Sequence, residues 1–285
     1  GSAVSLEVQG VEGTKVIEFS NFNNANSTDG LMASNIAAGY GHSVFLQSNG
    51  TVKTVGYNKY GELGDKTTTK RTTPVKISLS DVKQVEAGTY HTVFLMEDGT
   101  IKTVGYNNLG QLGDGTTTNK STPINIGLSG VKQVAASDSH TIFLMENSSI
   151  KAVGRNNHSQ LGDGTTTDKS IPVDIGLSGV KQIATGYYHT IFLMEDGSVK
   201  SVGYNNNGQL GDGTTTQRTT PVDIGLSGVK QISAGSNHTV FLMEDGSVKT
   251  VGWNHYGQLG NGTTGNKSTP IDIGLSGVKQ ISTGF

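Results

Sequence analysis

Residues 180–226 read VKQIATGYYHTIFLMEDGSVKSVGYNNNGQLGDGTTTQRTTPVDIGL, and the chain is built from copies of this stretch. Its landmarks return every 49 residues in both directions. They include five histidines and all five prolines: His42, His91, His140, His189, His238, Pro74, Pro123, Pro172, Pro221 and Pro270. A fixed period of this length predicts that each copy is one supersecondary unit, which must pack against its neighbours to bury its apolar side.

Each copy shows the pattern of four short strands. In the quoted copy the first is expected over residues 180–186 and the second over 189–194, HTIFLM, which is apolar on both faces and so is covered on both sides. Asp196-Gly197 predicts a tight turn into a third strand, and Pro221 is expected to open a fourth, at a start or an edge where a missing N–H is tolerated. A repeated four-stranded antiparallel meander predicts an all-β protein, a β-propeller.

The two ends of the chain resemble complementary fractions of one more blade. Residues 3–34 are interpreted as a degenerate part-blade, with strands over 4–9, 15–22 and 31–34, that lacks a first strand. Residues 278–285, VKQISTGF, supply one, and 281–285 act as the closing strand. We therefore expect one propeller domain over 1–285, with five repeats over 35–280 and a sixth blade in which Ile281 pairs near Leu6 to Val8. Such closure removes open sheet edges.

Composition limits the possible functions. The 285 residues contain no cysteine, which excludes disulfides, thiolate metal sites and cysteine nucleophiles. A net charge of -2 argues against a nucleic-acid partner, which normally needs a basic surface. No apolar run reaches the roughly 18 residues of a membrane span.

Three motifs recur in the copies: Gly-x-x-His, Val-Gly-Tyr-Asn and Gly-Gln-Leu-Gly. In these motifs the chain resembles the regulator of chromosome condensation repeat family, strongly from residue 36 onward and weakly before it. The resemblance implies a β-propeller, although the best-known members have seven blades. It also implies several activities, among them nucleotide exchange on a small GTPase with chromatin binding and, in a related bacterial propeller, inhibition of β-lactamases. In that family exchange depends on an inserted wedge in one blade, whereas these copies contain no insertion.

The periodic polar residues do not nominate a chemical site. Equivalent histidines on neighbouring blades should lie on the order of 10 Å apart, whereas zinc needs ligands at about 2.0 to 2.1 Å, so we interpret them as turn residues that satisfy local backbone groups. The LGDGTTT loops hold one carboxylate each, which favours an Asx-type turn over a calcium loop. No hydrolase elbow, HExxH or Walker motif is present. We therefore expect no catalytic residue, no metal and no cofactor.

The copies differ from one another in two loops, and all nine tyrosines and the single tryptophan fall there. In an up-and-down blade these two loops emerge on the same face, so one face should carry side chains that dominate binding hot spots. The candidate partner-binding residues are Tyr40, Tyr60, Tyr90, Arg155, His158, Tyr187, Tyr188, Asn237, Trp253, His255 and Tyr256. Tyr57, Tyr106, Tyr204 and Trp253 share one repeat position, and an alternative role for them is to fill the gap between blades.

These patterns favour a non-enzymatic protein–protein interaction module. A glycan-binding propeller is the first alternative, because aromatic rings stack on sugars, and an exchange-factor-like regulator is a further one. A lectin should repeat one pocket in every blade, whereas these loops differ, which favours a protein partner. The loop composition suits a secreted or surface bacterial protein, with a cytoplasmic location as the alternative. For the core, we expect Phe45, Phe94, Phe143, Phe192 and Phe241 to be almost fully buried.

Overall fold

A computed structural model describes residues 6–8, 15–17 and 36–284 of the chain. The chain divides into two compact units, Gly1–Met32 and Ala33–Phe285. In the first unit, β1 (Leu6–Val8) pairs antiparallel with β2 (Lys15–Ile17). These two strands lie within the first two strands expected of the degenerate part-blade, whose third, residues 31–34, falls outside the described residues.

The second unit contains five four-stranded antiparallel sheets, each with its strands in chain order. The first sheet consists of β3 (Ile36–Ala38), β4 (His42–Leu46), β5 (Val52–Gly56) and β6 (Arg71–Lys76). The second consists of β7 (Val82–Ala87), β8 (His91–Met96), β9 (Ile101–Gly105) and β10 (Lys120–Asn125). The third consists of β11 (Val131–Ala136), β12 (His140–Met145), β13 (Ile150–Gly154) and β14 (Lys169–Asp174). The fourth consists of β15 (Val180–Thr185), β16 (His189–Met194), β17 (Val199–Gly203) and β18 (Arg218–Asp223), and the fifth of β19 (Val229–Ala234), β20 (His238–Met243), β21 (Val248–Gly252) and β22 (Lys267–Asp272).

The strands follow from local sequence, with one correction. The expected second strand coincides with β16, and Gly197 turns the chain into β17 with a positive φ of 79°. The fourth strand is misplaced in the prediction: β18 begins at Arg218, so Pro221 lies inside it rather than at its start. A proline is tolerated there because β18 is an edge strand, and the register between β17 and β18 shifts between Ser201 and Gly203.

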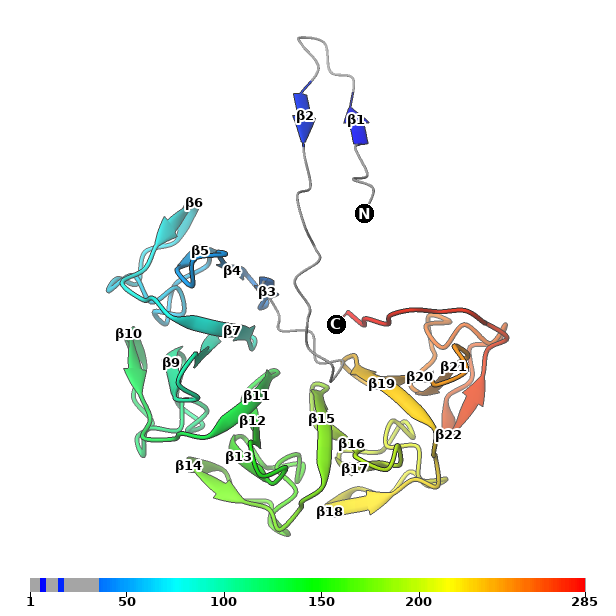
Figure 1. Cartoon of the computed structure of the whole chain (residues 1–285). Helices are drawn as coiled ribbons and strands as arrows, with labels where there is room; N and C mark the ends of the chain where they lie inside the picture. The colour runs from blue at the N-terminus through cyan, green and yellow to red at the C-terminus, as the bar shows by residue number, and fades with distance from the viewer. Residues whose placement is uncertain (1–5, 9–14, 18–35, 285) are drawn as a thin grey trace. The chain divides into compact units, whose positions relative to one another are not determined.

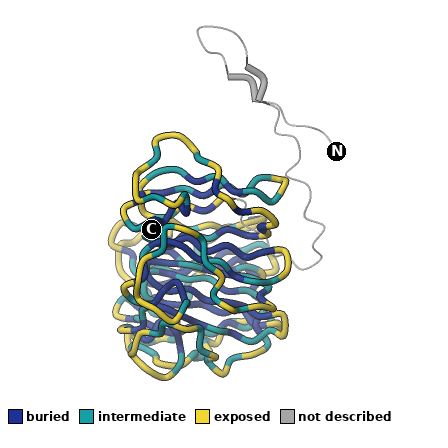
Figure 2. The backbone as a smooth tube through the Cα atoms, turned by 90° about the vertical axis from the view of Figure 1, so that its left-hand side faces the viewer, coloured by how far each residue is buried: buried dark blue, intermediate teal, exposed yellow. Residues whose placement is uncertain are grey.

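The sheets lie side by side with the first strand of each innermost, as Figure 1 shows for β3, β7, β11, β15 and β19. In Figure 2 the buried residues follow the strands and the exposed residues gather in the connecting loops. Four apolar clusters fill the spaces between successive sheets. In one of them Ile142 and Leu144 of β12 face Phe192 and Met194 of β16. In the second, third and fourth sheets the second strand is therefore covered on both faces, as its pattern predicts, whereas in the first and fifth sheets it is only partly covered.

The burial of the repeated phenylalanines is confirmed in four of the five sheets. Phe94, Phe143, Phe192 and Phe241 are fully buried, each against the preceding sheet. The prediction is wrong for Phe45, which is only partly buried. Its sheet is the first of the unit, so among the described residues no preceding sheet covers the side on which this ring lies.

The prediction of six blades is also wrong, because the described residues contain five four-stranded sheets. Residues 278–284 take the position of one more innermost strand but form no ladder. Ile281 N donates to Gln231 Oε1 at 3.1 Å and Ile281 O accepts from Gln231 Nε2 at 3.2 Å, as Val134 does with Gln84 in the second and third sheets. A sixth four-stranded sheet would need strands from both ends of the chain. The pairing of these two ends stays a prediction.

Hydrogen bonds also join the sheets. Nε2 of His42 lies 3.0 Å from Oγ1 of Thr92 in the next sheet, and that hydroxyl donates to the carbonyl oxygen of Glu62 at 2.8 Å. Equivalent bridges join His91 to Thr141, His140 to Thr190 and His189 to Thr239. The periodic histidines are therefore structural, but their partner is a threonine of the next sheet and not the local backbone, which corrects the sequence interpretation.

Candidate functional site

The loop after the third strand of each copy is held by a buried asparagine. Asn156 is fully buried, and its Nδ2 donates to Asp163 Oδ1 at 2.9 Å and to the carbonyl oxygens of Thr165 and Thr167 at 3.1 and 3.2 Å. Its Oδ1 accepts from Leu161 N at 3.0 Å. Four fully buried equivalents do the same work: Asn58, Asn107, Asn205 and Asn254. These asparagines fix the shape of the loops that carry the aromatic residues, and they do not themselves form the surface.

The aspartates of the LGDGTTT loops close Asx turns, as predicted. Oδ1 of Asp163 accepts from both Thr165 N and Thr165 Oγ1, and Oδ2 lies 3.1 Å from Lys169 Nζ. Burial alone would raise the pKa of Asp163, but hydrogen bonds from Thr165, Lys169 and Asn156 outweigh it, and the pKa is lowered. In the part of the chain that is described, no group of three or more histidine, aspartate or glutamate side chains is arranged to hold a metal ion.

The rings of the two variable loops form three aromatic clusters on what we call the loop face, and in two of these clusters the loops of neighbouring copies meet. The first cluster joins the first two copies and consists of Tyr40, Tyr57, Tyr60, Tyr90 and Tyr106. Tyr60 and Tyr90 lie at its centre, with ring centroids 5.2 Å apart. Tyr106 lies 4.8 Å from Tyr60 and Tyr57 lies 5.7 Å from Tyr90, so residues of both copies alternate.

The second cluster joins the third and fourth copies. The ring of His158 lies 4.5 Å from Tyr188 and 5.0 Å from Tyr204, and Tyr187 lies 4.5 Å from Tyr188. Arg155 stacks on Tyr188 with its guanidinium carbon 4.7 Å from the ring centroid. Desolvation lowers the pKa of His158, with a smaller contribution from the Arg155 charge, while a hydrogen bond with Gln217 opposes the change.

Arg155 is held by an ion pair inside its own copy. Its Nη1 lies 3.2 Å from Asp138 Oδ2 and donates to the hydroxyl of Tyr188 at 3.0 Å. Asp138 is only 6% exposed. Burial and then the charge of Asp138 raise the pKa of Tyr187 to about 12. The third copy thus replaces aromatic contacts with a charged pair at the centre of the second cluster.

The third cluster belongs to the fifth copy alone. Trp253 stacks against His255 with an interplanar angle of 14°, and Tyr256 contacts both rings. Tyr256 is 80% exposed and Tyr40, in the first cluster, is 78% exposed. These two side chains are the most accessible large apolar groups of the loop face.

The predicted partner-binding residues therefore gather in three groups. The first contains Tyr40, Tyr60 and Tyr90; the second contains Arg155, His158, Tyr187 and Tyr188; the third contains Trp253, His255 and Tyr256. Asn237 joins the second, where it lines one pocket together with His158, Tyr187 and Tyr188. The gap-filling alternative also has support, since Tyr106 and Tyr204 contact rings of the preceding copy.

Sequence reasoning missed two buried acids beneath the loop face. The sequence holds a signal for both. Asp138 and Arg155 both differ from the residues at the equivalent positions of the other copies, and Glu62 replaces a glutamine that the other four copies share.

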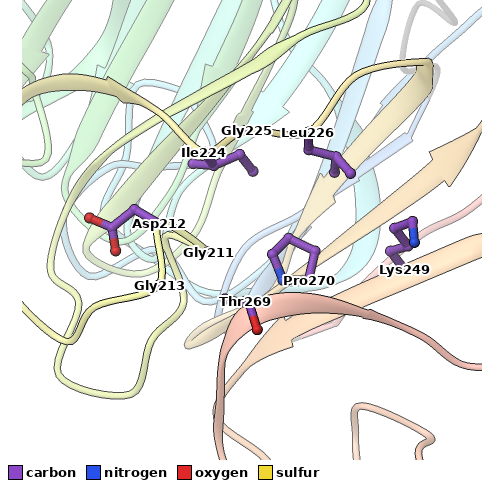
Figure 3. Close-up of a pocket in the computed structure, with 9 residues that line it drawn as sticks. All are labelled: Gly211, Asp212, Gly213, Ile224, Gly225, Leu226, Lys249, Thr269 and Pro270. Atoms are coloured by element: carbon purple, nitrogen blue, oxygen red, sulfur yellow. The ribbon is translucent and has the colours of Figure 1, made fainter.

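The second cluster contains a pocket of about 430 Å³, lined by residues that include His158, Tyr187, Tyr188 and Asn237. A second pocket of about 310 Å³ lies between the fourth and fifth copies (Figure 3). Pro270 projects there toward the Gly211 turn, and equivalent prolines approach Gly64, Gly113 and Gly162. This contact between a proline and a glycine turn recurs between successive copies, so of these two pockets only the first belongs to the variable surface.

The chain belongs to the family of RCC1-like domains, whose model matches residues 33–285. No curated protein sequence matches it. Within the described residues, no helix has the length and hydropathy that crossing a bilayer needs.

Solved structures share the fold of this chain. Human WBSCR16 is 26% identical, with a TM-score of 0.79, over 87% of this chain and 69% of that one. Yeast RCC1 (Prp20), solved with Kap60, is 23% identical, with a TM-score of 0.76, over 87% of this chain and 65% of that one. Prp20p from Saccharomyces cerevisiae, in a study of its binding to Gsp1p and histones, is 24% identical, with a TM-score of 0.74, over 87% of this chain and 67% of that one. This chain thus spans about two thirds of the length of these structures.

Proposed function

We propose that the propeller unit is a non-enzymatic protein-binding module and that its partner docks on the loop face. The observation that supports this proposal is the gathering of rings from the variable loops into aromatic clusters, two of which join neighbouring copies, with highly exposed rings at Tyr40 and Tyr256. Tyrosine and tryptophan combine a large apolar area with a polar group, and they dominate the energetics of protein interfaces. The membership of the chain in the RCC1-like family is consistent with an interaction module or regulator.

The composition of the clusters favours one protein partner over repeated glycan sites. The first cluster contains only tyrosine, the second contains an arginine and a histidine, and the third contains the tryptophan. A propeller lectin would present the same pocket on each blade, whereas a protein epitope needs different contacts at each point. The pocket of the second cluster supports glycan binding as the second candidate function, because tyrosine rings and the Asn237 amide line it.

The experiment is affinity capture of partners, followed by titration of variants. Tyr40→Ala and Tyr256→Ala should each weaken partner binding by about 2 kcal/mol, because exposed aromatic anchors at an interface contribute about that much. Neither should change the melting temperature appreciably. Tyr188, another candidate residue, is a poorer test, because it also supports Arg155.

The matched controls are Lys102→Glu and Lys200→Glu. Lys102 and Lys200 lie near the starts of β9 and β17, whereas the loop face is at the ends of these strands. These changes should leave affinity within about 1 kcal/mol, because exposed charges contribute little. Loss of binding in the lysine variants and retention in both tyrosine variants would reject the loop face. If only the pocket of the second cluster binds soluble glycans, the lectin alternative replaces the proposal.

A further inference from the structure

The Gly-Gln-Leu-Gly motif has a glutamate in the first copy only, at Glu62. In every copy one side-chain oxygen at this position accepts a backbone N–H from two residues earlier. Tyr60 N donates to Glu62 Oε2 at 2.8 Å, as His158 N does to Gln160 Oε1 at 2.9 Å. The same anchor is present at Gln111, Gln209 and Gln258. The side chain is therefore held in the same way throughout, and only the second terminal atom differs, an amide nitrogen in four copies and a carboxylate oxygen in the first.

In the fourth copy this second atom is directed toward the loop of the next copy, since Gln209 Nε2 lies 3.5 Å from Asn237 Oδ1. The equivalent atoms of Gln111 and Gln160 are buried without a hydrogen-bond partner among the described residues. The residue of the second copy that is equivalent to Asn237 is Tyr90, at the centre of the first cluster. Glu62 Oε1 therefore lies beneath the tyrosines. Glu62 is fully buried, and its Oε1 has no hydrogen-bond partner in the described part of the chain. None of the ion pairs among the described residues includes Glu62.

Several contacts confirm that Glu62 underlies the first cluster. Its side chain accepts from Tyr60 N, and its carbonyl oxygen accepts from Thr92 Oγ1, two residues after Tyr90. Its Cα approaches Gly105, next to Tyr106, so closely that a Cβ at Gly105 would lie 3.2 Å away. Desolvation, then Tyr60 and then Glu62 raise the pKa of Tyr57, so the carboxylate also acts on that ring.

A buried carboxylate with no cation beside it is electrostatically unsatisfied. Desolvation raises the pKa of Glu62, while backbone hydrogen bonds from Glu62, Tyr60 and Gly61 partly oppose that rise. The tyrosine faces above it carry negative electrostatic potential and attract cations. Lys59 shows this attraction, since its Nζ lies 5.7 Å from the ring centroid of Tyr60. Ring faces and carboxylate therefore favour the same ligand, a positively charged organic group.

We infer that the first cluster, with Glu62 beneath it, binds the cationic side chain of a lysine or arginine from the partner. The inference rests on the proposed function only in taking that partner to be a protein. The cation lies on the faces of Tyr57, Tyr60 and Tyr90, and Glu62 attracts it from below without being exposed. The other two clusters have glutamine at this position, so the first is the one that selects positive charge.

The test uses the full chain, with nuclear magnetic resonance signals of labelled tyrosine rings as the readout. The probes are butylammonium and butylguanidinium chloride, with 1-butanol as the neutral probe of similar size, all at equal ionic strength. The matched variant is Glu62→Gln, which gives the first copy the residue of the other four and so should fold normally. We expect both cations, but not butanol, to shift the ring signals, and we expect Glu62→Gln to weaken cation binding about tenfold. Lys59→Ala should strengthen it, because a competing cation is removed.

Equal shifts with butanol and the cations, unchanged cation affinity in Glu62→Gln, or no shift in the unmodified protein would each overturn the inference. The proposed function is judged separately. If Tyr256→Ala loses the captured partner while Glu62→Gln keeps it at full affinity, the loop face stands and the cation site is overturned. If the probes behave as expected but the Tyr40 and Tyr256 variants keep the partner, the cation site stands and the proposed function fails.

Discussion

Nε2 of His140 in the third sheet lies 3.3 Å from Oγ1 of Thr190 in the fourth, and the same hydroxyl donates to the carbonyl oxygen of Gln160 at 2.7 Å. Because the hydroxyl hydrogen is used on the carbonyl, His140 must donate through its Nε2–H. This assigns the neutral tautomer with an unprotonated Nδ1. One threonine thereby joins the fourth sheet to both a strand and a loop of the third repeat.

Replacing Thr190 with valine should lower the free energy of unfolding by about 2 to 3 kcal/mol, because it leaves the His140 N–H and the Gln160 carbonyl buried without partners. Thr190→Ser keeps the hydroxyl and should cost less than about 1.5 kcal/mol. Urea unfolding of both variants measures the difference. Equal losses for valine and serine would show that the bridge does not stabilise the sheet interface.

The histidines also predict how stability depends on pH. Burial lowers the pKa of His91, His140 and His189 to about 3 and that of His42 to about 4, from 6.5. The folded state keeps these rings neutral, whereas the unfolded state binds protons below about pH 6.5. The stability they contribute is therefore fully present above pH 6.5 and is lost as pH falls toward 3.

Burial raises the pKa of Glu62 and Glu86, which opposes this trend, but four histidines outweigh two carboxyl groups. The net slope should be roughly 3 kcal/mol per pH unit between about pH 6 and 4.5. Urea midpoints at several pH values measure it. His140→Gln should reduce the slope by about 1.4 kcal/mol per unit, and a slope that this change does not alter would contradict the assignment.

The repeated core could be predicted from local sequence, because strand length and side-chain direction depend on neighbouring residues. The pattern HTIFLM defines β16 correctly and places Phe192 between sheets. The exposure of Phe45 could not be predicted in this way, because all five copies carry the same pattern at that position. What differs is whether another sheet covers it, and that depends on long-range pairing.

In the candidate site, too, local sequence predicts some features and long-range contacts decide the others. The variable loops reveal which residues are available, such as Tyr60 and Tyr90, but not that these two rings make contact across copies. The role of Asn156 was also hidden, since its partners lie 5 to 11 residues away in a loop whose path the sequence does not reveal. Buried polar residues of this kind can be recognised only in the folded structure, where the path of the loop is known.

The two phenylalanines give a matched pair for testing the packing. Phe192→Ala should cost about 3 to 5 kcal/mol, because it opens a cavity between the third and fourth sheets. Phe45→Ala should cost less than about 2 kcal/mol, because its ring is only partly removed from water. Thermal or urea unfolding measures both. A loss at Phe45 as large as that at Phe192 would show that its side of the first sheet is covered in solution.

The last prediction concerns the charged pair of the third copy. The second copy has Thr89 and Tyr106 at the positions of Asp138 and Arg155, so it offers a neutral pair for the same site. Arg155→Tyr alone should lower stability by about 2 kcal/mol, because Asp138 is left buried without its cation. Asp138→Thr alone should cost less, since Arg155 is more exposed to water. The double change should restore stability to within about 0.5 kcal/mol of the unmodified protein if the two residues depend mainly on each other. A double-mutant cycle in urea measures this coupling, and additive losses would mean that each residue is held by Tyr188 and its other neighbours instead.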